Sequence, residues 1–162
     1  MTENIKDTEF MRVALAEAKK AYGIGDVPVG AAVVYEGRVI ATGYNKREKN
    51  KMATAHAELM AIEEACRVLG GWRLSGCTLY VTLEPCPMCA GAIVNSRIDR
   101  VVYGAADSAA GCAGSVINFN AYPFNHAFKV TSGVLADECR ELLREFFALQ
   151  RQKKKDGTEN EK

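Results

Sequence analysis

Two cysteines three positions apart, in the segment Pro85-Cys86-Pro87-Met88-Cys89, constrain the fold of this chain more than any other feature. If a helix begins there, residues at i and i+3 project from one face of its first turn. The helix dipole and the unpaired N–H groups of a helix start stabilise thiolates, so both sulfur atoms are suited to bind a metal. Zn²⁺ binds Cys and His readily. The pattern therefore predicts a zinc site at the start of a helix.

His56, one of two histidines in the chain, is the predicted third ligand. Three protein ligands leave one position of a tetrahedral ion open, which is typical of catalytic rather than structural zinc. Glu58 is then the predicted proton carrier beside the open position. Residues two apart in a regular helix point about 200° apart, so we expect His56 to lie at an irregular helix start. For the second histidine, His126, we expect a structural hydrogen bond.

Helix and strand signals alternate along the chain and predict an α/β fold, with a mixed, roughly five-stranded sheet in three α/β/α layers. Helices between strands imply crossovers and at least partly parallel pairing. In such sheets, sites form where helices begin at the carboxyl ends of strands. Helices are predicted over 8–22, from Thr54, from Cys86 and from Asp137; strands over 29–35, 38–44, 78–83, 100–103 and 129–132; a basic loop over 46–51; and a flexible Gly/Ala loop over 104–114.

The chain has 162 residues, of which 48% are hydrophobic and 25% are charged. We expect a single domain over residues 1–150, followed by a polar, basic tail over 151–162 that frays. No apolar run approaches the roughly 20 residues that a membrane span needs. The polar N-terminus has no secretory pattern, so we expect a cytoplasmic protein without a membrane partner. Four of the six cysteines lie outside the metal motif, and we expect them to be free thiols.

The segments around the metal motifs resemble those of the bacterial tRNA-specific adenosine deaminases, over about residues 10–147. This resemblance implies the cytidine-deaminase-like fold, one zinc ion per chain, a homodimer, and hydrolytic conversion of adenosine to inosine at the wobble position of a tRNA anticodon. The segments that carry it are Thr54-Ala55-His56-Ala57-Glu58, Thr82-Leu83-Glu84-Pro85-Cys86, Met88-Cys89-Ala90-Gly91-Ala92, Asn95-Ser96-Arg97-Ile98, Arg100-Val101-Val102-Tyr103-Gly104-Ala105 and Gly133-Val134-Leu135-Ala136-Asp137-Glu138.

Further site residues follow from the resemblance alone. It implies that Asn45 hydrogen-bonds the bound nucleoside, that Pro28 and Val29 form a pocket wall, and that the Ala57 backbone N–H contacts the base. It also implies a nucleotide contact by Asp107 and RNA-edge packing by Phe147. Each residue has a simpler interpretation: Asn45 can turn the chain after a strand, Val29 can be core, and Phe147 can extend a helical stripe.

Two basic clusters are candidate contacts to the RNA backbone, although charge runs are usually solvated surface. Lys46 and Arg47 belong to the first, and Arg151, Lys153 and Lys154 to the second. They favour RNA over a free base, because a free neutral base offers no phosphates. Deamination of a free base or nucleoside, such as guanine or cytosine, remains the alternative function. A non-catalytic zinc module that binds RNA is a third possibility.

Overall fold

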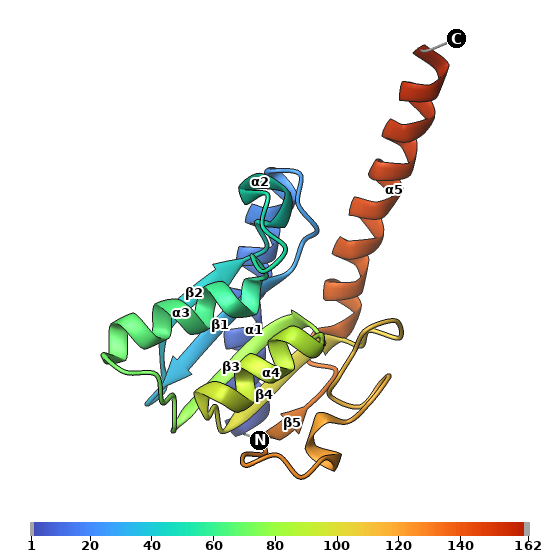
Figure 1. The fold of residues 1–162 in the computed structure, drawn as a ribbon. Coiled ribbons are helices and arrows are strands. Elements are labelled where there is room, and N and C mark those ends of the chain that lie inside the picture. The colour runs from blue at the N-terminus through green and yellow to red at the C-terminus, as the bar shows by residue number, and fades with distance from the viewer. Residues whose placement is uncertain (1, 161–162) are drawn as a thin grey trace.

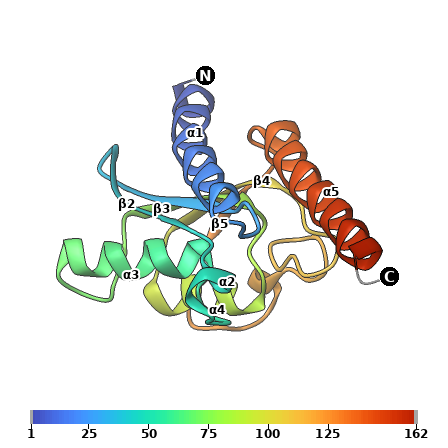
Figure 2. The ribbon, with the colours of Figure 1, turned by 90° about the horizontal axis from the view of Figure 1, so that it is seen from above.

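The computed structural model describes residues 2–160 and contains one five-stranded sheet between two layers of helices (Figures 1 and 2). The strand order is β2-β1-β3-β4-β5; β1 is antiparallel to β2 and β3, whereas β3 pairs with β4 and β4 with β5 in parallel. The strands are β1 (Gly30–Tyr35), β2 (Arg38–Tyr44), β3 (Cys77–Leu83), β4 (Arg100–Ala105) and β5 (Lys129–Thr131). The predicted mixed, five-stranded sheet in three layers is confirmed.

The helices cover both faces of the sheet. Figure 2 shows α1 and α5 on one side and α3 and α4 on the other. Close approach of helix and sheet depends on glycine: a Cβ at Gly30 would meet the backbone of Ala14 in α1, and a Cβ at Gly43 would lie 2.5 Å from the carbonyl oxygen of Ala57 in α3. The helices are α1 (Thr2–Gly23), α2 (Arg47–Asn50), α3 (Ala57–Leu69), α4 (Pro87–Ser96), α5 (Ala136–Asn160) and the short 3₁₀ helix η1 (Phe119–Ala121).

The β1–β2 hairpin closes through the predicted two-residue turn. Glu36 and Gly37 both have positive φ, at 50° and 75°. This combination is typical of the type I′ turn, whose twist matches that of the flanking strands.

Helices α3 and α4 begin at the same edge of the sheet. Because β2 and β3 run in the same direction, their carboxyl ends lie on the same side; β2 leads through α2 to α3, and β3 leads to α4. The N-cap residues are His56 for α3 and Cys86 for α4, both with extended backbone. Pro87 occupies the first turn of α4, where no N–H partner is lost. The topology thus brings both metal motifs to one place.

Four local predictions differ from the structure. Helix α1 begins at Thr2, six residues before the predicted start at residue 8. Helix α3 begins at Ala57 rather than at Thr54, and the basic loop over 46–51 contains the one-turn helix α2. The chain does not fray after Gln150, because α5 continues to Asn160. Its extension is rich in Lys, Arg and Gln, which are good helix formers. The side chains over 151–157 are all exposed, whereas several of those before residue 151 are buried or half-buried. Residue 150 therefore separates a packed part of α5 from a solvent-exposed part.

Over residues 2–160, no helix combines the length and the apolar character that crossing a membrane requires. All six cysteines are free, as predicted for the four outside the metal motif. His126 makes the predicted structural hydrogen bond, in which Nε2 donates to the carbonyl oxygen of Ile98 over 2.7 Å.

Candidate active site

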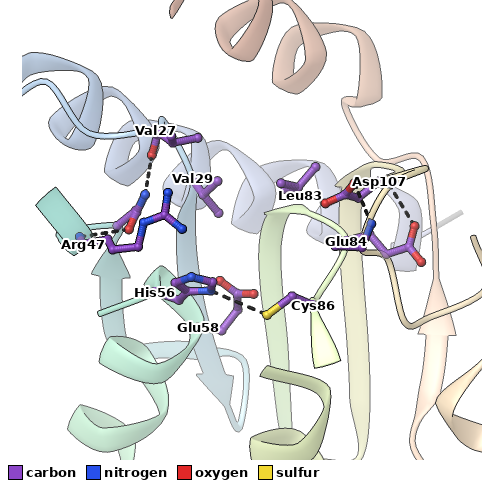
Figure 3. Close-up of a pocket in the computed structure, with 11 residues that line it drawn as sticks. Val27, Val29, Arg47, His56, Glu58, Leu83, Glu84, Cys86 and Asp107 are labelled. Carbon is purple, nitrogen blue, oxygen red and sulfur yellow. Dashed lines mark hydrogen bonds between the residues drawn. The ribbon is translucent and has the colours of Figure 1, made fainter. Parts of the chain in front are cut away.

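A pocket of about 180 Å³ opens at the sheet edge where α3 and α4 begin (Figure 3). This volume is below the range of about 300–1,000 Å³ that is usual for ligand sites, so the pocket suits one flat ring system rather than a whole nucleotide. It is lined by Val27, Val29, Asn45, Arg47, His56, Glu58, Leu83, Glu84, Cys86, Asp107 and Ala110.

The three predicted metal ligands lie together at this pocket: His56 and Cys86 line it, and Cys89 is fully buried beside them. The Nδ1 atom of His56 lies 3.6 Å from Sγ of Cys86 and 3.6 Å from Sγ of Cys89. Tetrahedral zinc with one nitrogen at about 2.05 Å and one sulfur at about 2.3 Å separates these atoms by about 3.6 Å. Among the described residues, this is the one group of three or more His, Cys, Asp or Glu side chains whose ligand atoms lie within 4.8 Å of one another. The donor set therefore fits one zinc ion.

The charges of His56, Cys86 and Glu58 influence one another's protonation. Hydrogen bonds from Cys89 and from His56 outweigh burial and lower the pKa of Cys86 to about 4, so a thiolate is available for a metal. Glu58 is only 4% exposed, and burial raises the pKa of its carboxyl group. In Figure 3 its side chain lies beside those of His56 and Cys86. A carboxyl group that can hold a proton thus stands next to the metal group.

Asn45 ties together the wall on the β2 side of the pocket. Its Nδ2 donates to the carbonyl oxygen of Val27 over 3.1 Å, and its Oδ1 accepts from the backbone N–H of Arg47 over 3.1 Å. A carboxamide has two N–H donors and two acceptor lone pairs, so these two bonds leave one of each for a ligand. Asp26, 1% exposed, accepts from the N–H groups of Glu48 and Lys49 and thereby fixes α2, which carries Arg47.

The opposite wall comes from the loop after β4. Asp107 and Ala110 line the pocket, and Oδ1 of Asp107 accepts from the N–H groups of Ala109 and Ala110. Glu84 also lines the pocket, and its carboxylate accepts hydrogen bonds from the same loop. Burial acts to raise the pKa of Glu84, but the hydroxyl of Ser115 and the loop N–H groups outweigh it and hold that pKa below its usual value. The loop predicted as flexible is therefore organised around a buried carboxylate.

The structure brings most of the predicted substrate residues to the pocket, with three differences. Val27 and Val29 line it, whereas Pro28 between them is buried and is not a lining residue. The N–H of Val29 donates to the carbonyl oxygen of Val27 over 2.8 Å, so Pro28 lies at the centre of a tight turn. The Ala57 side chain is buried, but its N–H lies at the open start of α3, where His56 provides no side-chain cap. Phe147 is not a lining residue; it is 44% exposed and packs edge-on against Phe146.

The basic residues occupy different places. Arg47 lines the pocket, while Lys46 lies over the ring of Tyr44 at 4.6 Å. Arg151, Lys153 and Lys154 are exposed on the extension of α5, which rises past the pocket end of the sheet in Figure 1. Arg151 and Lys154 follow Phe147 by four and seven residues, so these three share one helix face. Lys153 lies about 120° away from that face.

Four lining residues had no role in the sequence-based prediction: Val27, Leu83, Glu84 and Ala110. In the sequence, Val27 and Leu83 cannot be distinguished from residues of the hydrophobic core. Glu84 carried a usable signal, since it is an acidic residue between the apolar strand β3 and Pro85, where burial without a partner is costly. Its partners come from a distant loop that the sequence does not connect to it.

Comparisons with known proteins agree with this geometry. A family model described as "Cytidine and deoxycytidylate deaminase zinc-binding region" matches residues 4–105. A tRNA-specific adenosine deaminase of Bacillus subtilis (strain 168) is 51% identical over 156 residues, covering 96% of this chain and 97% of that protein. A solved structure from studies of A-to-I editing by tRNA:A34 deaminases at the wobble position has a TM-score of 0.81 and 46% identity, covering 83% of this chain and 99% of that one. A structure of guanine deaminase from Nitrosomonas europaea has a TM-score of 0.77 and 28% identity, covering 87% of this chain and 84% of that one.

Proposed function

Because this chain belongs to the cytidine and deoxycytidylate deaminase family, and within it to the tRNA-specific adenosine deaminases, we propose that it converts adenosine to inosine at the wobble position of a tRNA anticodon. It is a zinc-dependent deaminase with the cytidine-deaminase-like fold. The observation that carries the proposal is the meeting of one buried carboxyl group, Glu58, with the His56, Cys86 and Cys89 group in a pocket of single-base size.

In this proposal His56, Cys86 and Cys89 would hold the zinc ion, which would lower the pKa of a water molecule to about 7 and so supply a nucleophile at neutral pH. The Glu58 carboxylate accepts a proton from that water. It passes this proton to a ring nitrogen of the base, then accepts a second proton from the new C6 hydroxyl group and passes it to the departing amine. Overall, a C–O bond forms at C6 of adenine, the C6–N6 bond breaks, and adenosine plus water gives inosine plus ammonia.

Adenine is recognised by polar groups on both walls of the pocket. The spare N–H donor and lone pair of Asn45 face the bound nucleoside, and the Ala57 N–H contacts the base. Asp107 contacts the nucleotide from the opposite wall, and Val29 packs against the base. Arg47, at the pocket edge, meets the phosphate beside the extruded nucleotide. A loop nucleotide is already partly unstacked, so its extrusion costs less than extrusion from a duplex.

The remaining RNA contacts are proposed for the exposed extension of α5. Phe147, Arg151 and Lys154 share one face of that helix, and an aromatic ring followed by two cations suits stacking on a base with phosphate contacts beside it. Lys46 and Lys153 are weaker candidates, because Lys46 lies over Tyr44 and Lys153 lies on another face of α5.

Two other functions fit this chain less well. Deamination of a free base is chemically possible in the same pocket, and guanine deaminase is structurally similar, but at 28% identity rather than about 50%. A structural zinc module needs a fourth protein ligand. His126 is engaged with the carbonyl oxygen of Ile98, and Glu58 has no purpose in such a module.

The proposed function is tested by ammonia release from four substrates at equal concentration: an anticodon stem-loop with adenosine at the wobble position, free adenosine, guanine and cytosine. We expect release from the stem-loop at least about 100-fold faster than from the free compounds, because the RNA contacts contribute binding. Faster deamination of guanine or cytosine would make this chain a free-base deaminase.

We further propose that the chain is a cytoplasmic homodimer. Six free cysteines suit a reducing compartment. The groove between α3 and α4 contains Leu59, Ile62 and Trp72, the last 51% exposed, and a second copy of the chain would cover it. Sedimentation should then give twice the 17.6 kDa chain mass, and Trp72→Glu should give the monomer. A monomeric wild-type protein would contradict this proposal.

A further inference from the structure

Glu84 is a buried carboxylate whose acceptor capacity is fully used by one loop. It is 2% exposed. Its Oε1 accepts from the backbone N–H of Asp107 over 3.1 Å and from the hydroxyl of Ser115. Its Oε2 accepts from the N–H groups of Ala113 and Ser115 over 3.0 and 3.1 Å. An ionised carboxylate offers about four acceptor positions. Glu84 therefore has none left for a substrate, although it lies at the pocket wall.

The loop is fitted closely around this carboxylate. A Cβ at Gly111 would lie 2.5 Å from Oε1 of Glu84, so only glycine is accommodated there. The loop also returns to the metal segment, since the N–H of Cys112 donates to the carbonyl oxygen of Pro85 over 2.9 Å. Glu84 thus stands between the segment that carries Cys86 and the loop that carries Asp107.

We propose that Glu84 is a positioning residue for substrate, which holds the 107–115 loop so that Asp107 and Ala110 form the pocket wall opposite Asn45. The inference rests on the proposed function for the choice of substrate. Glu84 acts through the loop and takes no part in proton transfer, because the Glu58 carboxyl group performs that step. The loop contacts substrate before and during the reaction, and loss of such uniform binding raises KM more than it lowers kcat.

Glu84→Gln tests this assignment with little change of volume. An amide nitrogen cannot accept a hydrogen bond, so at least one backbone N–H of the loop loses its acceptor in either orientation of the amide. In the zinc-loaded protein, hydrogen exchange should become faster at the amides of Asp107, Ala113 and Ser115. KM for the stem-loop should rise by about tenfold or more, while kcat changes by less than about threefold and zinc content stays at one per chain.

Asp7→Asn is the matched control. Asp7 is also a buried carboxylate that accepts hydrogen bonds, from Tyr80 and Arg100, but it lies in α1 on the other face of the sheet. The Asp7→Asn variant should have a lower melting temperature and an unchanged KM. If both variants only lower the melting temperature, Glu84 is merely structural. If Glu84→Gln loses zinc, or lowers kcat at unchanged KM, Glu84 serves the metal segment and the proposal is wrong.

Ser115→Ala provides a milder variant that keeps the backbone hydrogen bonds and should fold even if Glu84→Gln does not. It removes one of the four bonds to the carboxylate, so we expect a smaller rise in KM, of about threefold; unchanged KM together with faster exchange of the loop amides would overturn the proposal. If the wild-type protein ignores the stem-loop and deaminates a free base, the proposed function fails, and the same comparison of KM and kcat is made with that base.

Discussion

His56 and Glu58 are two residues apart, yet both side chains reach the same pocket, because only Glu58 lies inside helix α3. His56 is the N-cap residue, with an extended backbone at φ −79° and ψ 151°. Within a regular helix their side chains would point about 200° apart. The change of backbone conformation at one residue thus places a metal ligand and a proton carrier side by side.

Replacing one ligand should remove the metal. We expect Cys86→Ser to lose zinc and activity, because the hydroxyl is a much weaker zinc ligand than the thiolate. Metal analysis of the purified protein measures this directly. Cys66→Ser is the control, since that half-buried thiol lies near the far end of α3 and should leave one zinc per chain. Full zinc occupancy in Cys86→Ser would refute the ligand assignment.

Glu58→Ala should keep its zinc and its fold but lose turnover. The carboxyl group is assigned to proton transfer and not to metal binding. General acid–base groups contribute about 10²- to 10⁴-fold in rate, and this one acts on more than one step. The measurements are kcat with the stem-loop and zinc content of the same sample. Near-normal turnover would mean that a group other than Glu58 transfers the protons, and loss of zinc would make Glu58 a ligand.

Neutralising the basic face of α5 should weaken RNA binding without altering the chemical step. In the double variant Arg151→Gln, Lys154→Gln, the slope of log affinity against log salt concentration should become shallower by about 1.4. This is about 0.7 for each of two lost single-strand phosphate contacts. At saturating stem-loop, kcat should stay the same. Glu141→Gln with Asp156→Asn, on another face of α5, is the control for nonspecific charge effects. An unchanged salt slope in the basic-face variant would leave α5 with no role in binding.

Asp7 should contribute to stability in a pH-dependent way. Burial acts to raise its pKa, but hydrogen bonds from Arg100 and Tyr80 outweigh it and hold the pKa below its usual value. A carboxyl group with a lowered folded-state pKa stabilises the protein above its unfolded pKa and loses that contribution as pH falls through the folded value. Asp7→Asn should therefore cost about 2 kcal/mol at neutral pH and progressively less below about pH 4. Denaturant unfolding at each pH measures the difference, and a constant difference down to about pH 2 would contradict the assignment.

The sequence was sufficient where structure depends on local chemistry. The Glu36-Gly37 turn, the Cys86 helix start and the irregular position of His56 each follow from a few neighbouring residues. Prediction failed where a segment is fixed by a distant partner. Asp26 caps α2 from 22 residues away, and Glu84 organises a loop that begins 23 residues later. The length of α5 was also missed, because its exposed extension has no apolar stripe to signal a helix.

The central claim is that this chain deaminates adenosine at the wobble position of a tRNA anticodon. Its most direct test uses two stem-loops of identical composition, one with adenosine at the first anticodon position and one with that adenosine exchanged with its neighbour. Inosine is mapped and kcat/KM is measured for each. We predict inosine at the first position only, with kcat/KM lower by about 100-fold or more for the exchanged loop. Equal conversion of the two loops, or deamination of a free base in preference to both, would contradict the claim.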